Sequence, residues 1–331
     1  MLIKDIGEFD LIKRISADLT PTGRSVIVGI GDDSAVLHPP AGRLQLVTTD
    51  MLVENVHFRL DIAEPFQIGW KSIAVNISDI AAMGGEPTYA FISIGLQRET
   101  TVEFVDDLYS GMRRIAKAYS VDIVGGDTVS SPHLIINIAL LGEVEAENVV
   151  LRSGAQTGDA LVVTGDLGGS EAGLAILKHG LPVEGTEKHL MPTPRVREGR
   201  LLAKSGHVTS MIDISDGLAS EVHHICEASG TGARLYVRNI PISDNVHRVA
   251  EHIGKKSHDF ALYGGEDYEL LFTCQPDKVS LLAEDILKDC GTPLTTVGQI
   301  MEMSHSITME DTSGRIVPLE PRGYDHFAPS T

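Results

Sequence analysis

The chain has 331 residues, which is enough for two domains of about 150 residues each. Hydrophobic residues make up 42% and charged residues 22%, a composition typical of a globular protein and not of a disordered one. The 27 lysines and arginines against 46 aspartates and glutamates give a formal net charge of −19. This charge argues against nucleic acid and against an anionic membrane surface as partners, because both are bound through a basic face.

The cysteines and the apolar stretches indicate the cellular compartment in which the protein is expected. Cys226, Cys274 and Cys290 form no CxxC pair and are too few for a disulfide framework, which is typical of a reducing compartment. Residues 1–14 mix charges with apolar residues and lack the apolar core of a signal peptide. The most apolar stretch, residues 134–141, is too short to span a bilayer. We therefore expect a soluble, cytoplasmic protein.

Hydrophobic periodicity predicts six elements in the N-terminal half. Helices are expected at residues 65–83 and 102–119, where apolar residues recur at helical spacing, and Gly84 with Gly85 ends the first helix. Strands are expected at residues 44–48, 88–96, 121–124 and 134–141. We interpret this succession as a ferredoxin-like β–α–β–β–α–β sandwich.

A polar, turn-rich segment at residues 146–158 is the expected boundary between a first domain, residues 1–150, and a second, residues 151–331. Beyond it, strands are expected at residues 160–164, 211–214, 233–237, 268–274 and 294–300, and helices at residues 171–179, 218–229 and 277–289. Residues 178–200 contain three prolines and are predicted to form a long surface connection. The predicted fold class is therefore α/β (α+β) with two domains.

Five short acidic segments stand apart from the other carboxylates. Each places an aspartate beside Gly, Ser or Thr, either directly after an apolar strand-like run or on a helix between apolar residues. They are GIGDD (29–33), TTD (48–50), NISD (76–79), GGDT (125–128) and DISDG (213–217). Any one of them alone is better explained by a turn or a helix cap, so only the set of five indicates function.

The five segments together predict a metal site. Strand ends are where α/β folds place their sites, and carboxylates that converge there repel one another unless cations lie between them. Oxygen ligands with no accompanying Cys or His favour Mg²⁺, which usually completes its shell with substrate phosphates. The sequence therefore predicts a site with several Mg²⁺ ions that holds a polyphosphate.

Several familiar signatures are absent. There is no GxxxxGK[ST] P-loop and no protein-kinase HRD and DFG pair. The segment that begins at Gly29 lacks the third glycine of the dinucleotide fingerprint and places two carboxylates where pyrophosphate would lie. His223, His224 and Cys226 lie on a predicted helix with no second pair of ligands, so we interpret them as ordinary helix residues and not as a zinc site.

The acidic segments belong to a longer series of motifs that spans nearly the whole chain. These are GIGDDSAV (29–36), TTDMLVENVHF (48–58), KSIAVNISDIAAMGGEP (71–87), GGDT (125–128), RSGA (152–155), DISDGL (213–218), GGEDYEL (264–270) and GYDHF (323–327). In this order they resemble the thiamine-monophosphate kinase family, of the superfamily that includes aminoimidazole ribonucleotide synthetase and selenophosphate synthetase. The loop around residues 180–192 and the C-terminal tail match less clearly.

The resemblance implies an activity and an assembly. ATP gives its γ-phosphoryl group to the phosphate of thiamine monophosphate, which yields ADP and thiamine diphosphate in the last step of thiamine diphosphate biosynthesis. ATP is the co-substrate and several Mg²⁺ ions are the cofactors. The resemblance also implies a homodimer, in which the N-terminal domains share a β-barrel and ATP binds near their interface, while the C-terminal domain is an α/β sandwich that completes the substrate site.

The resemblance further assigns roles to individual positions. The implied Mg²⁺ ligands are Asp33, Thr48, Thr49, Asp50, Asp79, Asp127, Asp213 and Asp216. The implied ATP contacts are Gly126, Asp127, Arg152 and Ser215, and the implied thiamine monophosphate contacts are His57, Glu266 and Tyr324. Asp32 lies next to the implied ligand Asp33. Two roles stay open for it: it can support that ligand from behind, or it can be a turn residue.

The residue types agree with this chemistry. A phosphate oxygen is already ionised at pH 7, so we expect no general base and name no catalytic residue. The difficulty is the repulsion between two polyanions, which Mg²⁺ ions that bridge donor and acceptor oxygens would cancel. Arg152 is the basic group that we expect at the triphosphate, and a surface arginine in a linker is its alternative.

The three expected acceptor contacts each keep an alternative. His57 can hydrogen-bond the phosphate or the thiamine, or can be a structural histidine. Tyr324 can stack on the cationic thiazolium ring or pack in the core. Glu266 can face the positive charge of the ligand or bind backbone at a turn.

Two other functions remain open at this stage. One is an ATP-dependent ligase or synthetase of the same superfamily; a selenophosphate-synthetase role is disfavoured because all three cysteines lie beyond residue 225. The other is an acidic, Mg²⁺-dependent nucleotide-binding or interaction module that forms no product.

Overall fold

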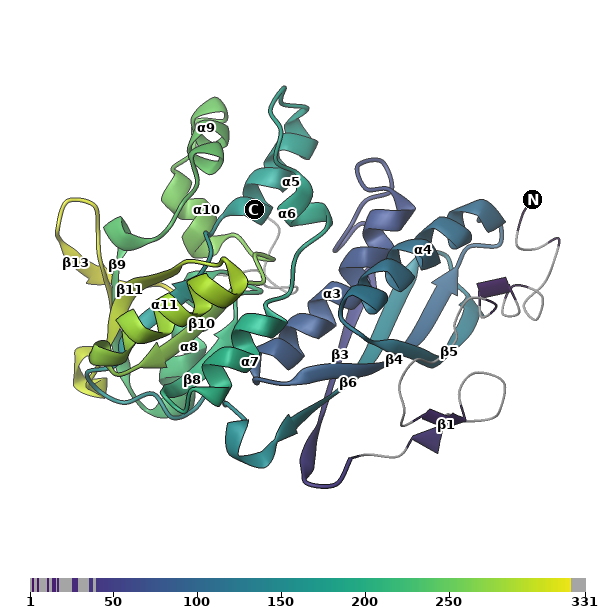
Figure 1. Cartoon of the computed structure of the whole chain (residues 1–331). Helices are drawn as coiled ribbons and strands as arrows, with labels where there is room; N and C mark the ends of the chain where they lie inside the picture. The colour runs from purple at the N-terminus through teal and green to yellow at the C-terminus, as the bar shows by residue number, and fades with distance from the viewer. Residues whose placement is uncertain are drawn as a thin grey trace. The chain divides into compact units, whose positions relative to one another are not determined.

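The computed structural model describes residues 40–322, together with residues 2, 5, 11, 14, 15 and 17 and the backbone of two short paired strands, β1 (Val26–Val28) and β2 (Val36–Leu37). The chain divides into two compact units (Figure 1). Unit 1 comprises Met1–Ile80 and Gly85–Glu147, and unit 2 comprises Ala81–Gly84 and Asn148–Thr331. Three positions of interest, Asp32, Asp33 and Tyr324, lie outside the described residues.

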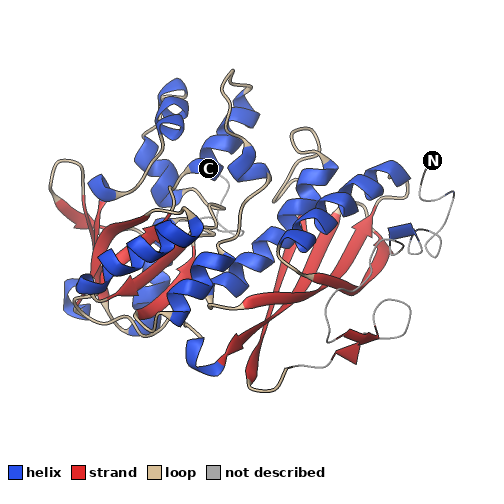
Figure 2. Ribbon diagram, in the orientation of Figure 1, coloured by secondary structure: helices blue, strands red, loops and turns tan. Residues whose placement is uncertain are grey.

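Unit 1 contains a four-stranded sheet. Its strands are β3 (Arg43–Val53), β4 (Glu86–Leu96), β5 (Asp122–Ser130) and β6 (Ile135–Glu145). They lie in the order β3-β6-β4-β5, with β4 and β5 parallel and the other pairs antiparallel. The sheet is open in the single chain, and Figure 2 shows its strands beside their two helices.

The helices α3 (Pro65–Ala82) and α4 (Val102–Ala118) bury one side of this unit. Helix α4 begins at Thr101, whose hydroxyl accepts a hydrogen bond from the Phe104 amide at 3.1 Å. The two helices approach closely at glycines, since a Cβ on Gly69 or on Gly111 would lie 1.9 Å from a carbonyl oxygen of the other helix. In β6, Ile136, Ile138 and Leu140 are buried and the residues between them are partly exposed, so one face of the sheet is apolar and covered.

The six elements predicted for unit 1 follow one another in the observed order, β–α–β–α–β–β, and the fold class is the predicted mixed α/β class. The interpretation of that succession as a ferredoxin-like β–α–β–β–α–β sandwich is wrong. Because β5 is parallel to β4, the chain must cross over between them, and α4 provides that crossover. Strand β6 then lies between β3 and β4, so that β4 separates it from β5, the strand that precedes it in the chain.

Unit 2 is built on a seven-stranded sheet. Its strands are β7 (Ala160–Thr164), β8 (Val208–Asp213), β9 (Gly232–Tyr236), β10 (Leu270–Cys274), β11 (Leu294–Met301), β12 (Ile307–Glu310) and β13 (Ile316–Pro318). They lie in the order β13-β12-β9-β11-β7-β10-β8, and only the β12–β9 pair is parallel.

The helices of unit 2 cover both faces of the sheet. They are α5 (Gly169–His179), α6 (Glu187–Leu190), α7 (Val196–Lys204), α8 (Leu218–Ser229), α9 (Asp244–His252), α10 (Ser257–Tyr263) and α11 (Val279–Cys290). Single 3₁₀ turns lie at Ala146–Asn148, Val237–Asn239, Pro276–Lys278 and Met303–His305. Central β7 is buried throughout: Leu161 and Val163 pack in the core that contains α8, and Ala160 and Val162 pack in the core that contains α7 and α11. This explains its uninterrupted apolar run.

The prediction of a surface connection at residues 178–200 is wrong. This segment contains α6 and the first half of α7, and His189, Leu190, Glu198 and Arg200 are buried within it. Its buried polar side chains, His189, Glu198 and Arg200, find their partners in distant parts of unit 2. A search for apolar periodicity therefore misses it.

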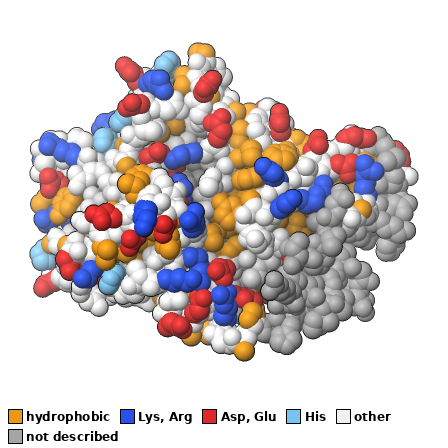
Figure 3. Space-filling view, in the orientation of Figure 1, with side chains coloured by type: hydrophobic (Ala, Val, Ile, Leu, Met, Phe, Trp, Pro, Cys, Tyr) orange, Lys and Arg blue, Asp and Glu red, His pale blue; other side chains and the backbone are white. Residues whose placement is uncertain are grey.

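The surface and the helices give two further facts. Acidic, basic and apolar side chains are interspersed on the face drawn in Figure 3. Among the helices of residues 40–322, none combines the length and the apolarity that crossing a membrane requires.

Candidate functional site

Strand β3 and helix α3 bring together three of the expected metal ligands in unit 1. The Thr48 hydroxyl donates a hydrogen bond to Asp79 Oδ2, and the Asp50 amide donates one to Asn76 Oδ1 at 3.1 Å. Asn76 is fully buried and its Nδ2 donates to the Ser72 carbonyl at 3.0 Å, which fixes the orientation of its side chain. We call Asp50 and Asp79 the β3–α3 acid pair.

The acid pair is electrostatically unfavourable without a cation. Burial raises the pKa of Asp50 to about 7, and the charge of Asp79 adds to the rise. Two carboxylates and a hydroxyl are the oxygen donors that a hard divalent ion prefers. Within residues 40–322, no group of three or more His, Cys, Asp or Glu side chains is arranged to hold a metal, so an ion at the acid pair would need water or phosphate oxygens as further ligands.

Thr49 and Asp127 lie elsewhere on the sheet of unit 1. The Thr49 hydroxyl donates to Asn137 Oδ1 at 3.2 Å, on the face opposite to Thr48 and Asp50. Asp127 shares this second face, because the register aligns it through Ser93 and Asn137 with Met51 of β3. Three strand spacings separate β5 from β3, which amounts to about 14 Å.

Gly126 and His57 have clear structural roles. A Cβ on Gly126 would lie 1.9 Å from the Ile92 carbonyl oxygen, so the backbones of β4 and β5 can approach only because this residue is glycine. His57 Nδ1 accepts a hydrogen bond from the Val53 amide at 3.0 Å and so holds the turn after β3. In that arrangement the neutral ring carries its proton on Nε2.

In unit 2, the predicted acidic segment DISDG (213–217) and the motif GGEDYEL (264–270) lie side by side. The Ile214 amide donates to the Glu269 carbonyl at 2.8 Å, and the Tyr268 amide donates to the Ile214 carbonyl at 2.9 Å. The Glu266 amide donates to the Ser215 carbonyl at 2.7 Å. The DISDG segment after β8 and the GGEDYE segment before β10 thus form one structure.

Glu221 is a residue of this region that the sequence analysis missed. Its Oε1 accepts hydrogen bonds from the Asp216 amide at 3.0 Å and from the Ser215 hydroxyl at 3.4 Å, at the start of α8. Burial raises the pKa of Glu221 to about 7, while the positive charge of Arg152 acts to lower it. Arg152 itself is exposed. The signal in the sequence is an acid in the first turn of a helix that follows DISDG.

Asp213 is buried at the end of β8, and Asp216 and Ser215 are partly exposed in the loop that follows. Ser215 and Asp216 therefore lie at the N-terminus of α8, and the charge of Arg152 acts on the same Glu221 that binds them.

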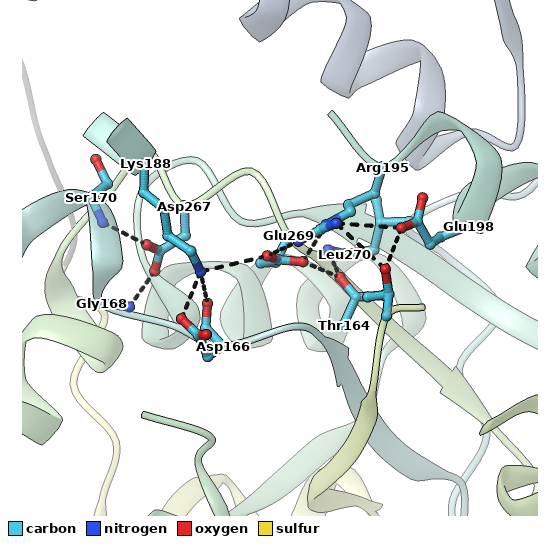
Figure 4. Close-up of polar contacts among 11 residues, drawn as sticks. Thr164, Asp166, Gly168, Ser170, Lys188, Arg195, Glu198, Asp267, Glu269 and Leu270 are labelled. Carbon is cyan, nitrogen blue, oxygen red and sulfur yellow. Dashed lines mark hydrogen bonds and ion pairs between the residues drawn. The ribbon is translucent and has the colours of Figure 1, made fainter. Parts of the chain in front are cut away.

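The GGEDYE segment, residues 264–269, is here called the acidic loop. Its backbone is unusual, since Glu266 and Tyr268 have φ values of 66° and 51°. Asp267 is buried and accepts hydrogen bonds from the amides of Gly168 at 2.6 Å and of Ser170 at 3.0 Å (Figure 4). Burial raises the pKa of Asp267 to about 7 despite these two bonds.

Glu269 anchors the other end of the acidic loop. It accepts two hydrogen bonds from Arg195, at 2.7 and 2.6 Å, and a third from the Thr164 hydroxyl at 2.6 Å (Figure 4). Lys188 Nζ lies 3.9 Å from Glu269 and 2.6 Å from Asp166. These basic partners were missed by the sequence analysis, because their segment carries no signal of its own.

Comparison with known proteins extends these observations to the whole chain. Residues 31–144 match the family described as AIR synthase related protein, N-terminal domain, and residues 156–309 match its C-terminal domain. The chain is 37% identical to the thiamine-monophosphate kinase of Bacillus subtilis (strain 168), over 97% of this chain and 100% of that protein.

Two solved structures resemble this fold closely. Thiamine-monophosphate kinase from Stenotrophomonas maltophilia K279a superposes with a TM-score of 0.82 at 32% identity, covering 92% of this chain and 96% of the other. AaThiL complexed with AMPPCP and TMP superposes with a TM-score of 0.77 at 33% identity, covering 99% of both chains. By its sequence and by its fold, the chain belongs to the thiamine-monophosphate kinase family, among the AIR synthase related proteins.

Proposed function

We propose that this chain transfers the γ-phosphoryl group of ATP to the phosphate of thiamine monophosphate, giving ADP and thiamine diphosphate. The observation that carries the proposal is the similarity to thiamine-monophosphate kinases over 97% of the chain, at 37% identity, with all of the relative covered. The likeness to AaThiL complexed with AMPPCP and TMP supports the same pair of substrates.

The reaction requires no general base from the protein. The acceptor is a phosphate oxygen that is already ionised at neutral pH, so the residues need only bind, align and neutralise the reactants. We assign Gly126, Asp127, Arg152 and Ser215 to ATP. We assign His57, Glu266 and Tyr324 to thiamine monophosphate. The hydrogen bonds of Ser215 and Asp216 to Glu221, and the charge of Arg152 that acts on Glu221, support a phosphate-binding role for this loop.

Mg²⁺ is part of the proposal, and the β3–α3 acid pair is its support. Thr48, Asp50 and Asp79 supply hard oxygen donors, and a bound cation would remove the unfavourable charge that burial creates there. Bound Mg²⁺ would supply neutralisation of phosphate charge and alignment of the two reacting oxygens. The further proposed ligands are Asp33, Thr49, Asp127, Asp213 and Asp216.

A homodimer is also proposed, through the face of the unit 1 sheet that carries Thr49 and Asp127. Three apolar side chains on that face are well exposed: Val47 at 69%, Met51 at 52% and Val129 at 53%. A second copy of the chain that pairs at this face, as in the shared β-barrel that the family resemblance implies, would remove them from water. Sedimentation equilibrium tests this, with a monomer at micromolar concentration as the contrary outcome.

The remaining assignments stay predictions. They are a cytoplasmic location and a functional division at residue 150, with ATP, Mg²⁺ and dimerisation assigned to residues 1–150 and completion of the substrate site assigned to residues 151–331.

Product analysis tests the activity directly. Purified protein is incubated with ATP, Mg²⁺ and thiamine monophosphate, and the nucleotides and thiamine esters are separated by chromatography. We expect ADP and thiamine diphosphate in equal amounts, and loss of turnover in Asp50→Ala and Asp127→Ala. Product only with an aminoimidazole precursor would favour a ligase, and nucleotide binding without any product would favour a binding module. Turnover above about a tenth of wild type in either variant would contradict the metal assignment.

A further inference from the structure

The acidic loop is held by residues that precede their partners by 74 to 99 positions in the sequence. Asp267 is tied to the first turn of α5, and Glu269 is tied to Arg195 (Figure 4). Glu266 directly precedes Asp267, and its own side chain is 27% exposed. The fold therefore fixes the loop through Asp267 and Glu269 and presents Glu266.

The side chain of Glu266 has a close partner on helix α6. His189, on α6, places Nδ1 3.3 Å from Glu266 Oε2 and 3.1 Å from the Ser170 hydroxyl. The His189 side chain is only 7% exposed. Ser170 is the same residue whose amide binds Asp267, so His189 joins Glu266 to the frame that already holds its neighbour.

Hydrogen-bond chemistry favours one tautomer at this contact. An ionised carboxylate only accepts, and so it cannot face an unprotonated ring nitrogen favourably. A proton on His189 Nδ1 can be donated to Glu266 or to the Ser170 oxygen, which both lie within 3.3 Å. The ring is buried, and its helix α6 packs against α5.

The backbone conformation of the acidic loop explains why the contact between His189 and Glu266 matters. Glu266 and Tyr268 both adopt the left-handed conformation, which is unfavourable for residues with a Cβ, on either side of the buried Asp267. Such a loop keeps its shape only if surrounding contacts over-determine it. A carboxylate that must meet a ligand in one orientation gains from a partner that limits its rotamers before the ligand arrives.

We propose that His189 is a positioning residue for Glu266, and that it sets the orientation in which this carboxylate meets the thiamine monophosphate. The inference rests on the proposed function, in which Glu266 contacts that substrate. In this proposal His189 does not contact the substrate itself and acts on it only by orienting Glu266.

A double-mutant cycle tests the inference. The variants are His189→Phe, Glu266→Gln and the pair of both, with kcat and the KM for each substrate measured separately. We expect His189→Phe to raise the KM for thiamine monophosphate about fivefold or more, with the KM for ATP within about twofold of wild type. In the Glu266→Gln background the same change should have no further effect, because the group that it orients has already been altered.

Two companion variants separate positioning from folding. His189→Asn keeps a side-chain N–H near the place of Nδ1 and should restore most of the affinity. His223→Phe is the matched control, since His223 is a half-buried histidine of unit 2 whose Nε2 lies 2.8 Å from the Leu319 carbonyl, away from the acidic loop. It should leave both KM values unchanged.

A measurement on the unaltered ring completes the test without relying on the stability of a variant. In ¹⁵N-histidine-labelled wild-type protein, His189 Nδ1 should be protonated, and its shift should change in Glu266→Gln while that of His223 does not. An unprotonated His189 Nδ1 overturns the proposal. An equal loss from His189→Phe in both backgrounds also overturns it, and so does an unchanged KM for thiamine monophosphate in Glu266→Gln, while the kinase activity stands. Absence of thiamine monophosphate phosphorylation by the wild type would instead refute the proposed function.

Discussion

Replacing Asp50 by Asn should stabilise the metal-free protein while it destroys activity. Asp50 has a pKa of about 7, raised from 3.8 by burial and by the neighbouring Asp79. Each pKa unit corresponds to 1.36 kcal/mol, so keeping this carboxylate ionised in the folded state costs about 4 kcal/mol well above pH 7. Asparagine has the same shape and no charge, and we expect the free energy of unfolding to rise by about 2–4 kcal/mol at pH 8.

The sign of the pH dependence follows from the same shift. Because the folded pKa of Asp50 lies above the unfolded one, the penalty is complete above pH 7, declines as the pH falls, and disappears below about pH 4. The stabilisation by Asp50→Asn should therefore be about 2 kcal/mol smaller at pH 5.5 than at pH 8. Asp267 and Glu221 also have pKa values of about 7, but they contribute equally to wild type and variant and cancel in the difference.

Urea denaturation in the presence of EDTA, at pH 8 and at pH 5.5, measures both quantities. The control is Asp127→Asn, which alters another proposed metal ligand, one that is exposed, and which should lose activity with a stability change below about 0.5 kcal/mol. A variant Asp50→Asn no more stable than wild type at pH 8, or equally stabilised at both pH values, would refute the reasoning.

Three other expectations concern single features. Arg195→Met leaves Glu269 buried without its two guanidinium hydrogen bonds and should lower the free energy of unfolding by about 3–5 kcal/mol in urea, whereas adding Glu269→Gln should recover part of the loss. Gly126→Ala drives a Cβ into the Ile92 carbonyl and should lower the melting temperature by several degrees, and an unchanged melting temperature would mean that β4 and β5 separate easily. Complete chelation of divalent ions should abolish ATP binding in calorimetry, and unchanged affinity in EDTA would argue against cation-mediated binding of the nucleotide.

Local pattern was sufficient for much of the fold. Helix α8 occupies the residues that periodicity predicts, because Gly217 and Gly230 flank it and Gly230 adopts the left-handed conformation that ends a helix. Strand β7 was equally clear, since a five-residue apolar run between polar turns suits a strand buried on both faces. In both cases the decisive signals lie within a dozen residues of one another.

Strand order was less accessible, and it determines which acids meet. The segments around Asp50, Asp79 and Asp127 look alike in sequence, yet only the first two come together in unit 1. Strand β6 lies between β3 and β4, and the register places Asp127 on the other face of the sheet. A one-residue change in register would reverse that face, and no single segment specifies it.

The partners of the acidic loop were inaccessible for a different reason. Lys188 contacts Asp166, 22 positions away, and Arg195 contacts Glu269, 74 positions away. His189 contacts Glu266. Buried polar pairs leave no apolar periodicity, so a short helix such as α6 looks like surface loop until its partners are known.

The left-handed backbone at Glu266 and Tyr268 has a consequence for directed evolution. A saturation library at these positions that is screened only for heat resistance should drift toward glycine or asparagine, which tolerate that geometry without strain. The same library screened for thiamine diphosphate output should retain glutamate at position 266. The two screens would therefore select different residues at position 266. Sequencing this codon then shows whether a selection has favoured thermal stability or turnover.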